Sequence, residues 1–332
     1  TGHHCASVGI RMNVESNRVA AQYRRFLDPQ TLARLKGLDL VARFAVEGFM
    51  AGLHRSPFHG FSAEFSDHRQ YISGDPIRHL DWKVYAKTQR LYLKRYEEDT
   101  NLQAYLLLDR SGTMAYGSDG LSKWDYARMV AASLAHLLLS QRDAVGLALF
   151  DHDVRRWLPA RSTPGHRDAL LAEMDRFPAE NPTDPSSALH VLAERVRRRS
   201  LIILISDMLI PAGAVASVPG VTLADAMVDR WLNTLKHFRH QGHDVLVFHV
   251  LHRDEVDFEF SGSVEFAGLE GEPGLLVDTW SVAHIYRQHM STYLRAAEKA
   301  CGEIHVDYHR LFTSSPLDLA LSSCLDKRRR LG

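Results

Sequence analysis

The stretch that decides the fold is residues 106–114, which read Leu-Leu-Leu-Asp-Arg-Ser-Gly-Thr-Met. Three leucines lead directly into Asp109, and two hydroxyl side chains follow at alternate positions, Ser111 and Thr113. A continuous apolar run that ends in a polar turn is typical of a strand buried on both faces of a parallel sheet. Ligands of such sheets bind outside the carboxyl ends of the strands, so Asp109 is predicted to lie at a ligand-binding edge.

The turn itself offers one carboxylate and two hydroxyls, and Gly112 gives it conformational freedom. Carboxylates and hydroxyls are hard oxygen ligands of the kind that Mg²⁺ prefers. The turn therefore predicts a metal site. The alternative at this point is a simple strand-to-helix turn, in which Ser111 or Thr113 caps the next helix.

Composition limits the classes of protein that the chain can represent. Lys and Arg together number 40, as do Asp and Glu, which argues against a nucleic-acid partner attracted by bulk charge. The cysteines Cys5, Cys301 and Cys324 are odd in number and far apart, so a disulfide framework is not expected and a reducing cytosol fits best. The longest apolar runs, 201–205 and 245–251, are far shorter than the ~20 residues of a membrane-spanning helix. We expect a soluble, cytoplasmic protein without a membrane span.

The chain divides into segments of different character. Apolar strands and amphipathic helices alternate from residue 103 onward, which predicts an α/β fold with a doubly wound, mostly parallel sheet and helices on both faces. The expected units are a remnant outside the fold at 1–11, an N-terminal helical segment at 12–54, a β-rich extension at 55–102, the α/β core at 103–255, and a C-terminal hairpin and helices at 256–332.

The C-terminal segment is predicted in more detail. We expect a β-hairpin at 256–267 that turns at Ser261-Gly262, a helix at 279–300, a strand at 303–308 and a last helix near 315–325. The basic tail at 327–330 is interpreted as a solvated terminus.

A second acid follows a second buried strand. The aliphatic run 201–205 ends in Ser206-Asp207, so Asp207 is expected at the same sheet edge as Asp109. The polar segment 181–187 precedes a helix and is expected to approach that edge through Thr183. Its alternative role is helix capping by Asp184 or Thr183, with a proline in the first turn.

Asp109-x-Ser111-x-Thr113, together with Thr183 and Asp207, resembles the metal-ion-dependent adhesion site of von Willebrand factor A domains. The usual motif has serine where this chain has Thr113, which still supplies a hydroxyl. The resemblance implies that Ser111, Thr113 and Thr183 bind Mg²⁺ (or Mn²⁺ or Ca²⁺) directly, whereas the two aspartates act largely through water. It also implies that the sixth position accepts a carboxylate from a partner protein.

A block upstream of the metal-site strand resembles the signature of a bacterial family called domain of unknown function 58. The block comprises Glu64, Phe65, Arg69, Tyr71, Gly74, Asp75, Arg78, Asp81, Trp82 and Lys83, and the resemblance extends over roughly residues 55–325. Relatives are often encoded beside MoxR-type AAA+ ATPases, which implies a partner or adaptor role. Asp75, Arg78, Asp81 and Trp82 form either a buried ion pair beside a packed tryptophan or a partner-facing patch.

The strongest alternative is a metal-dependent phosphatase, because residues 106–113 also resemble the nucleophile motif of the haloacid dehalogenases. Asp109 would then form an aspartyl-phosphate. Ser111 stands where that family has a second aspartate, and a hydroxyl cannot replace a carboxylate as proton shuttle near neutral pH. We therefore expect no enzyme, but a divalent-metal-dependent protein-interaction module that serves as adaptor or partner of an AAA+ ATPase.

Overall fold

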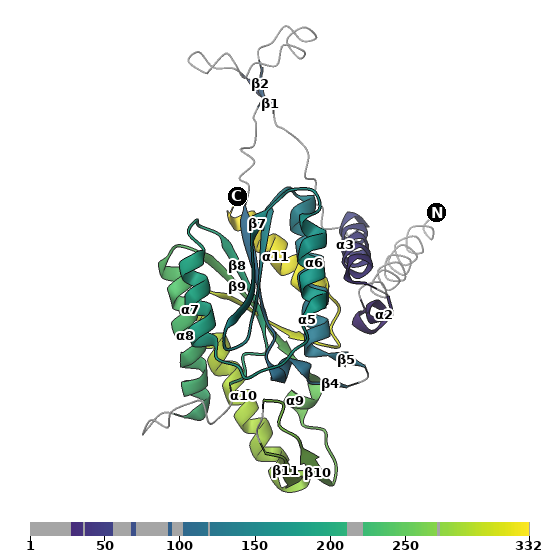
Figure 1. Ribbon diagram of the computed structural model, residues 1–332, viewed down its shortest axis with the longest axis vertical. Coiled ribbons are helices and arrows are strands. Elements are labelled where there is room, and N and C mark those ends of the chain that lie inside the picture. The colour runs from purple at the N-terminus through teal and green to yellow at the C-terminus, as the bar shows by residue number, and fades with distance from the viewer. Residues whose placement is uncertain are drawn as a thin grey trace, which may run out of the picture.

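A central six-stranded sheet forms the body of the protein (Figure 1). The structure, a computed structural model, describes residues 28–35, 37–55, 68–70, 92–94, 102–118, 120–210, 222–270 and 273–331. The sheet strands are β3 (Gln103–Asp109), β6 (Ala144–Phe150), β7 (Val154–Arg161), β8 (Leu201–Ser206), β9 (Asp244–Leu251) and β12 (Asp307–Phe312). Their order is β12-β9-β8-β3-β6-β7, and every neighbouring pair is parallel except β6 with the edge strand β7.

The strand order reverses direction at one point. The chain builds β3, β6 and β7 outward to one side and then returns to place β8, β9 and β12 on the other side of β3. This order confirms the predicted doubly wound, von Willebrand factor A-like sheet. The crevice at such a reversal is the usual ligand-binding position, and here it lies between the carboxyl ends of β3 and β8.

Helices cover both faces of the sheet (Figure 1). One layer contains α3 (Leu38–Arg55), α5 (Lys123–Ser140), α6 (His166–Arg176) and α11 (Asp318–Leu331), and the other contains α7 (Pro185–Arg195), α8 (Leu223–His240) and α10 (Thr279–Glu303). Successive residues of a strand point to opposite faces. Accordingly, Leu106 and Leu108 pack into the first layer and Leu107 into the second, which is why β3 is apolar without interruption.

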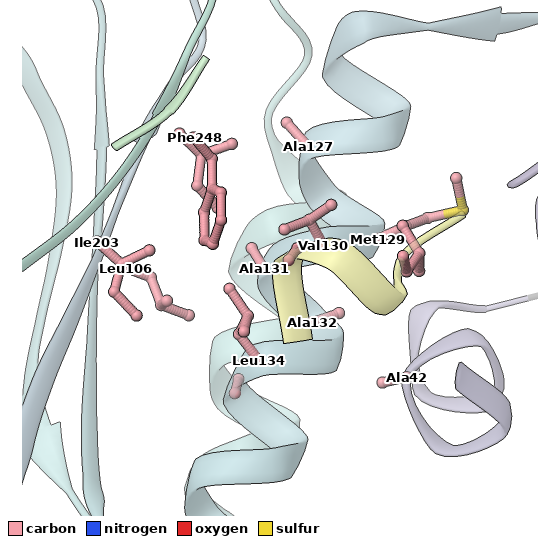
Figure 2. Packing of buried hydrophobic residues seen from close by; sticks show 14 of the residues in the cluster. Ala42, Leu106, Ala127, Met129, Val130, Ala131, Ala132, Leu134, Ile203 and Phe248 are labelled. Atoms are coloured by element: carbon pink, nitrogen blue, oxygen red, sulfur yellow. The ribbon is translucent and has the colours of Figure 1, made fainter. Parts of the chain in front are cut away.

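Small side chains allow α5 to approach the sheet and α3 closely. Ala127 and Ala131 of α5 are fully buried, and Figure 2 shows Phe248 between this helix and the sheet strands that carry Leu106 and Ile203. Ala42 of α3 is equally buried and lies on the other side of α5. The short helix α2 (Pro29–Ala33), capped by Asp28, precedes α3. Among the described residues, the N-terminal helices α2 and α3 thus belong to the packed body of the protein.

Two C-terminal predictions were wrong in position. The hairpin is formed by β10 (Ser263–Phe266) and β11 (Leu275–Asp278), so the connection lies between Phe266 and Leu275 and not at Ser261-Gly262. The short helix α9 (Arg253–Asp257) occupies the start of the predicted hairpin. The predicted strand at 303–308 begins later, at Asp307, because α10 continues to Glu303.

The basic tail forms the last turn of α11, in which Arg329 and Arg330 are exposed, as predicted for a solvated terminus, whereas Lys327 and Arg328 are not. Lys327 is almost completely buried, and its ammonium lies 3.3 Å from Asp307 Oδ2. Arg328 donates hydrogen bonds to Asp143 at the start of β6. These ion pairs neutralise the basic residues, so the helix can continue where the charge pattern alone predicts fraying.

Smaller elements complete the described chain. They are the 3-10 turn η3 (Gly112–Ala115), the two-stranded pair β4 (Gly117–Ser118) and β5 (Leu121–Ser122), and the antiparallel pair β1 (His68–Gln70) and β2 (Tyr92–Lys94). Among the described helices, none is long and apolar enough to cross a membrane.

Candidate functional site

Asp109 ends β3 and is fully buried at the reversal point of the sheet. Its Oδ1 accepts a hydrogen bond from the Ser111 amide at 2.9 Å, and its Oδ2 accepts one from Ser206 Oγ at 2.6 Å. Burial, followed by the nearby charge of Asp207, raises the pKa of Asp109 to about 7. The carboxylate therefore lies in an environment in which a positive charge would be strongly favoured.

The two hydroxyls of the turn face each other. Ser111 Oγ lies 3.1 Å from Thr113 Oγ1. Ser111 makes no side-chain capping bond to η3, and the long helix α5 is capped by Ser122, which forms a capping box with Asp125. The alternative in which Ser111 or Thr113 caps the next helix is therefore wrong, and both hydroxyls are available at the sheet edge.

The loop that carries Thr183 is fastened to the end of β3. The Glu180 amide donates to the Arg110 carbonyl, and the Gly112 amide donates to the Asn181 carbonyl, both at 2.8 Å. The buried guanidinium of Arg110 also contacts the segment before Thr183, because it donates to the Pro178 carbonyl. The same guanidinium pairs with Asp151 at 3.1 Å. Arg110 thus positions the loop from within the motif itself.

Helix α7 is capped by Asp184, the other residue of the Thr183 loop that was predicted as a possible helix cap. Asp184 accepts from the Ser186 amide at 3.0 Å, and Pro185 occupies the first turn. This arrangement confirms capping by Asp184 and leaves the Thr183 hydroxyl out of the cap. Thr183 is buried and lies at the site edge.

Asp207 follows β8 and is paired with a buried lysine that sequence reasoning missed. Lys123 Nζ lies 2.7 Å from Asp207 Oδ2 and 2.5 Å from Glu255 Oε1. Asp207 Oδ1 accepts from the Leu209 amide at 3.0 Å. Although burial favours the neutral amine, the two carboxylates raise the pKa of Lys123 above its usual value, so the ammonium stays charged. Composition and position alone do not distinguish Lys123 from an exposed lysine at the start of a helix.

A second missed residue contacts the hydroxyl side of the site. Glu270, in the turn between β10 and β11, accepts from Thr183 Oγ1 at 2.7 Å, from the Thr183 amide at 2.9 Å and from the Thr113 amide at 3.3 Å. Because the sequence pattern predicts the hairpin turn at Ser261-Gly262, it does not identify Glu270 as a site residue.

All five predicted site residues thus lie at one edge of the sheet, at the ends of β3 and β8 and in the adjoining loop. They are Asp109, Ser111, Thr113, Thr183 and Asp207. Neighbouring oxygens of an octahedral Mg²⁺ shell, each about 2.0–2.1 Å from the ion, lie about 2.9 Å apart. The 3.1 Å between the Ser111 and Thr113 hydroxyls fits this separation. Within the described ranges, no group of three or more His, Cys, Asp or Glu is suited to a metal, so a cation here would depend on hydroxyl ligands.

The signature residues Asp75, Arg78, Asp81 and Trp82 lie outside the described residues.

The phosphatase alternative gains no support from the site. Both oxygens of Asp109 accept hydrogen bonds and the side chain is fully buried, so neither oxygen is exposed for attack on a substrate.

An apolar cavity of about 560 Å³ borders the polar site. It lies between α10 and the β10–β11 hairpin, and Phe258, Phe266 and Ile285 are among its lining residues. Tyr116 and Glu255 also line it, and both belong to the surroundings of Lys123. The surface at this edge of the sheet therefore combines polar and apolar groups.

Comparison with known proteins identifies the family of the chain. The family model described as "Protein of unknown function DUF58" matches residues 67–299, most of the chain, and the protein belongs to this family. Uncharacterized proteins of Mycobacterium tuberculosis and Mycobacterium bovis are each 26% identical to it over 286 residues, which cover 83% of both chains.

Solved structures similar to the protein include a conserved hypothetical protein, BatB, from Bacteroides thetaiotaomicron. It has a TM-score of 0.43 and 15% identity, and the match covers 69% of this chain and 99% of that one. The VWA domain of SpRpn10 has a TM-score of 0.37 and 13% identity, with 67% of this chain and 94% of that one covered.

Proposed function

We propose that the protein is a divalent-cation-dependent protein-interaction module. In this proposal Ser111, Thr113 and Thr183 contribute hydroxyl oxygens to Mg²⁺, or to Mn²⁺ or Ca²⁺ in its place, and Asp109 and Asp207 contribute through water. The observation that carries the proposal is the convergence of these residues at the reversal point of the sheet, with the Ser111 and Thr113 hydroxyls 3.1 Å apart.

The charge of the donor set supports a carboxylate as the partner group. Hydroxyls are neutral, and Asp207 already pairs with the ammonium of Lys123. A divalent cation held here would therefore keep much of its charge uncompensated. An aspartate or glutamate side chain of a partner protein would gain a strong charge-assisted interaction.

The proposed partner is an AAA+ ATPase of the MoxR type, with this protein as its adaptor. The chain belongs to the family of unknown function matched above. The support for this partner is what the resemblance to that family implies, namely that relatives are often encoded beside such ATPases. Binding of a purified MoxR-type ATPase from the same source, measured with and without chelator, tests the partner separately from the cation.

The cation is tested by thermal unfolding. A ligand at 100 times its Kd stabilises the folded state by about 2.7 kcal/mol, which corresponds to roughly 5 °C for a chain of this size. We expect Mg²⁺ or Mn²⁺ to raise the Tm of the wild type and not that of Ser111→Ala. The control is Ser140→Ala, at the exposed far end of α5, about 25 Å along the helix from Lys123.

The control should respond to the cation as the wild type does. Equal shifts in the wild type and Ser111→Ala would contradict the proposed site. Circular dichroism before heating establishes that Ser111→Ala is folded, so a missing shift reports the lost hydroxyl.

A further inference from the structure

The hydroxyl side of the site is already occupied by a carboxylate of the same chain. Glu270 accepts three hydrogen bonds there, from the Thr183 hydroxyl, the Thr183 amide and the Thr113 amide. Thr113 and Thr183 are two of the three residues whose hydroxyls are proposed to bind the cation. Glu270 therefore lies beside the hydroxyls that an acidic ligand of the proposed cation would have to approach.

Gly112 provides a second and independent sign that this contact belongs to the fold. A Cβ at residue 112 would lie 2.3 Å from the Leu269 carbonyl oxygen and 3.1 Å from Glu270 Cγ. Gly112 lies in the 3-10 turn and is not among the glycines with positive φ, so its backbone does not require glycine. The close approach of Leu269 and Glu270 explains the glycine within the metal-site motif.

We infer that residues 267–270 regulate the site, with Glu270 as a built-in competitor of the acidic side chain of a partner. The inference rests on the proposed function. The partner reaches the site only in the fraction of molecules in which Glu270 has left it, so its apparent affinity is reduced by that fraction. A hairpin anchor with no regulatory role would hold the same contact but would not compete with an external carboxylate.

The contact itself is tested by amide hydrogen exchange of Thr113 and Thr183, whose N–H groups donate directly to Glu270. We expect Glu270→Ala to speed exchange at both amides at least about tenfold. Gly112→Ala should do the same without removing any oxygen, because its methyl group displaces Leu269. The matched control is Glu265→Ala, an exposed glutamate on β10, which should leave both amides unchanged. Unchanged exchange in Glu270→Ala would overturn the inference.

Competition is tested with Mn²⁺ as the cation and acetate as the smallest external carboxylate. Water proton relaxation reports how acetate changes the surroundings of bound Mn²⁺. We expect Glu270→Ala and Gly112→Ala to respond at acetate concentrations at least about tenfold lower than the wild type and Glu265→Ala, because the competitor is gone. Equal acetate responses in the wild type and Glu270→Ala overturn the inference.

The two proposals fail in different ways. If Mn²⁺ binds the wild type, but acetate acts at the same concentrations in the wild type and in Glu270→Ala, only the inference is overturned. Mn²⁺ that binds neither the wild type nor Glu270→Ala overturns the proposed cation site and the inference with it.

Discussion

The ammonium of Lys123 lies 2.7 Å from the carboxylate of Asp207, and both side chains are completely buried. Lys123 is the first residue of α5, where the helix dipole disfavours a positive charge, so its position is explained by Asp207 and Glu255 and not by the helix. Removing one partner of a buried pair leaves the other charge uncompensated. The pair therefore couples the start of α5 to the end of β8.

We expect Lys123→Met to lower the free energy of unfolding by about 3–5 kcal/mol, because Asp207 would remain buried without its cation. Urea unfolding measures the change. Adding Asp207→Asn to Lys123→Met should recover part of the loss, since the uncompensated charge is gone. Lys299→Met is the control, because Lys299 is exposed on α10 and 3.8 Å from Glu303, and it should change stability by less than about 0.5 kcal/mol. A loss below about 1 kcal/mol for Lys123→Met would contradict the assigned role.

Arg110 is the residue that fastens the Thr183 loop to the motif. We expect Arg110→Lys to destabilise the protein by about 1–3 kcal/mol, because one ammonium cannot reach both the Pro178 carbonyl and Asp151 as the guanidinium fork does. Arg156→Lys is the matched control, since the half-exposed Arg156 forms its one ion pair among the described residues with Glu173. Its expected change is within about 0.5 kcal/mol. Similar urea midpoints for the two variants would show that the loop does not depend on the fork.

The burial of the His243 ring leads to a prediction of how the free energy of unfolding depends on pH. The ring is buried, its Nδ1 accepts from the Ser200 amide at 3.2 Å, and its Nε2 lies 3.1 Å from the Val196 carbonyl. Burial lowers the pKa of His243 below its usual value of 6.5. The unfolded chain therefore binds the proton first, and the stability contributed by the neutral ring is lost as the pH falls from about 6.5 through the lower folded-state pKa.

We expect His243→Gln to be less stable than the wild type at pH 8 and to show a shallower loss of stability between about pH 6.5 and pH 5, where one proton contributes up to about 1.4 kcal/mol per pH unit. Urea unfolding at each pH gives the slope. The exposed His284 on α10 is the control, and His284→Gln should retain the slope of the wild type. A slope unchanged in His243→Gln would assign the acid sensitivity to other groups.

Much of the fold follows from local sequence signals. The strands β3, β8 and β9 contain apolar runs at 104–108, 201–205 and 245–248 because both faces of the sheet are covered, and these runs are too short for a long helix. Asp109 and Asp207 could be paired from sequence because parallel strands bring their carboxyl ends to one edge. Thr183 could be added because its segment precedes a helix with a proline in the first turn.

The remaining site residues could not be predicted because their positions depend on tertiary contacts. Lys123 is predicted to be exposed by any composition rule, and only the neighbouring carboxylates explain its burial. Glu270 lies 157 positions from Thr113, in a turn whose register is set by the pairing of Phe266 with Leu275. Sequence patterns favoured Ser261-Gly262 as the turn because of its glycine. Gly262 does adopt a positive φ, but it lies before β10 begins and is not the hairpin turn.

Thr113 provides the sharpest test of how the site would hold a cation. Its hydroxyl faces Ser111 Oγ at 3.1 Å, and its amide donates to Glu270. Thr113→Val keeps the shape of the side chain and removes only the hydroxyl, whereas Thr113→Ser keeps the hydroxyl and removes the methyl group. We expect Mn²⁺ affinity, measured by isothermal titration calorimetry, to fall at least about tenfold in Thr113→Val, since about 1.4 kcal/mol corresponds to one factor of ten.

Thr113→Ser should bind Mn²⁺ as tightly as the wild type or more tightly, because a methyl group beside a compact octahedral shell can only crowd it. The two substitutions therefore separate the oxygen of Thr113 from its bulk at a single position. If Thr113→Val bound Mn²⁺ as the wild type does, Thr113 would have to be removed from the ligand set, whatever the result for Ser111. If Thr113→Ser alone lost affinity, the methyl group would be needed to pack the turn, and the hydroxyl of Thr113 would have no part in binding the cation.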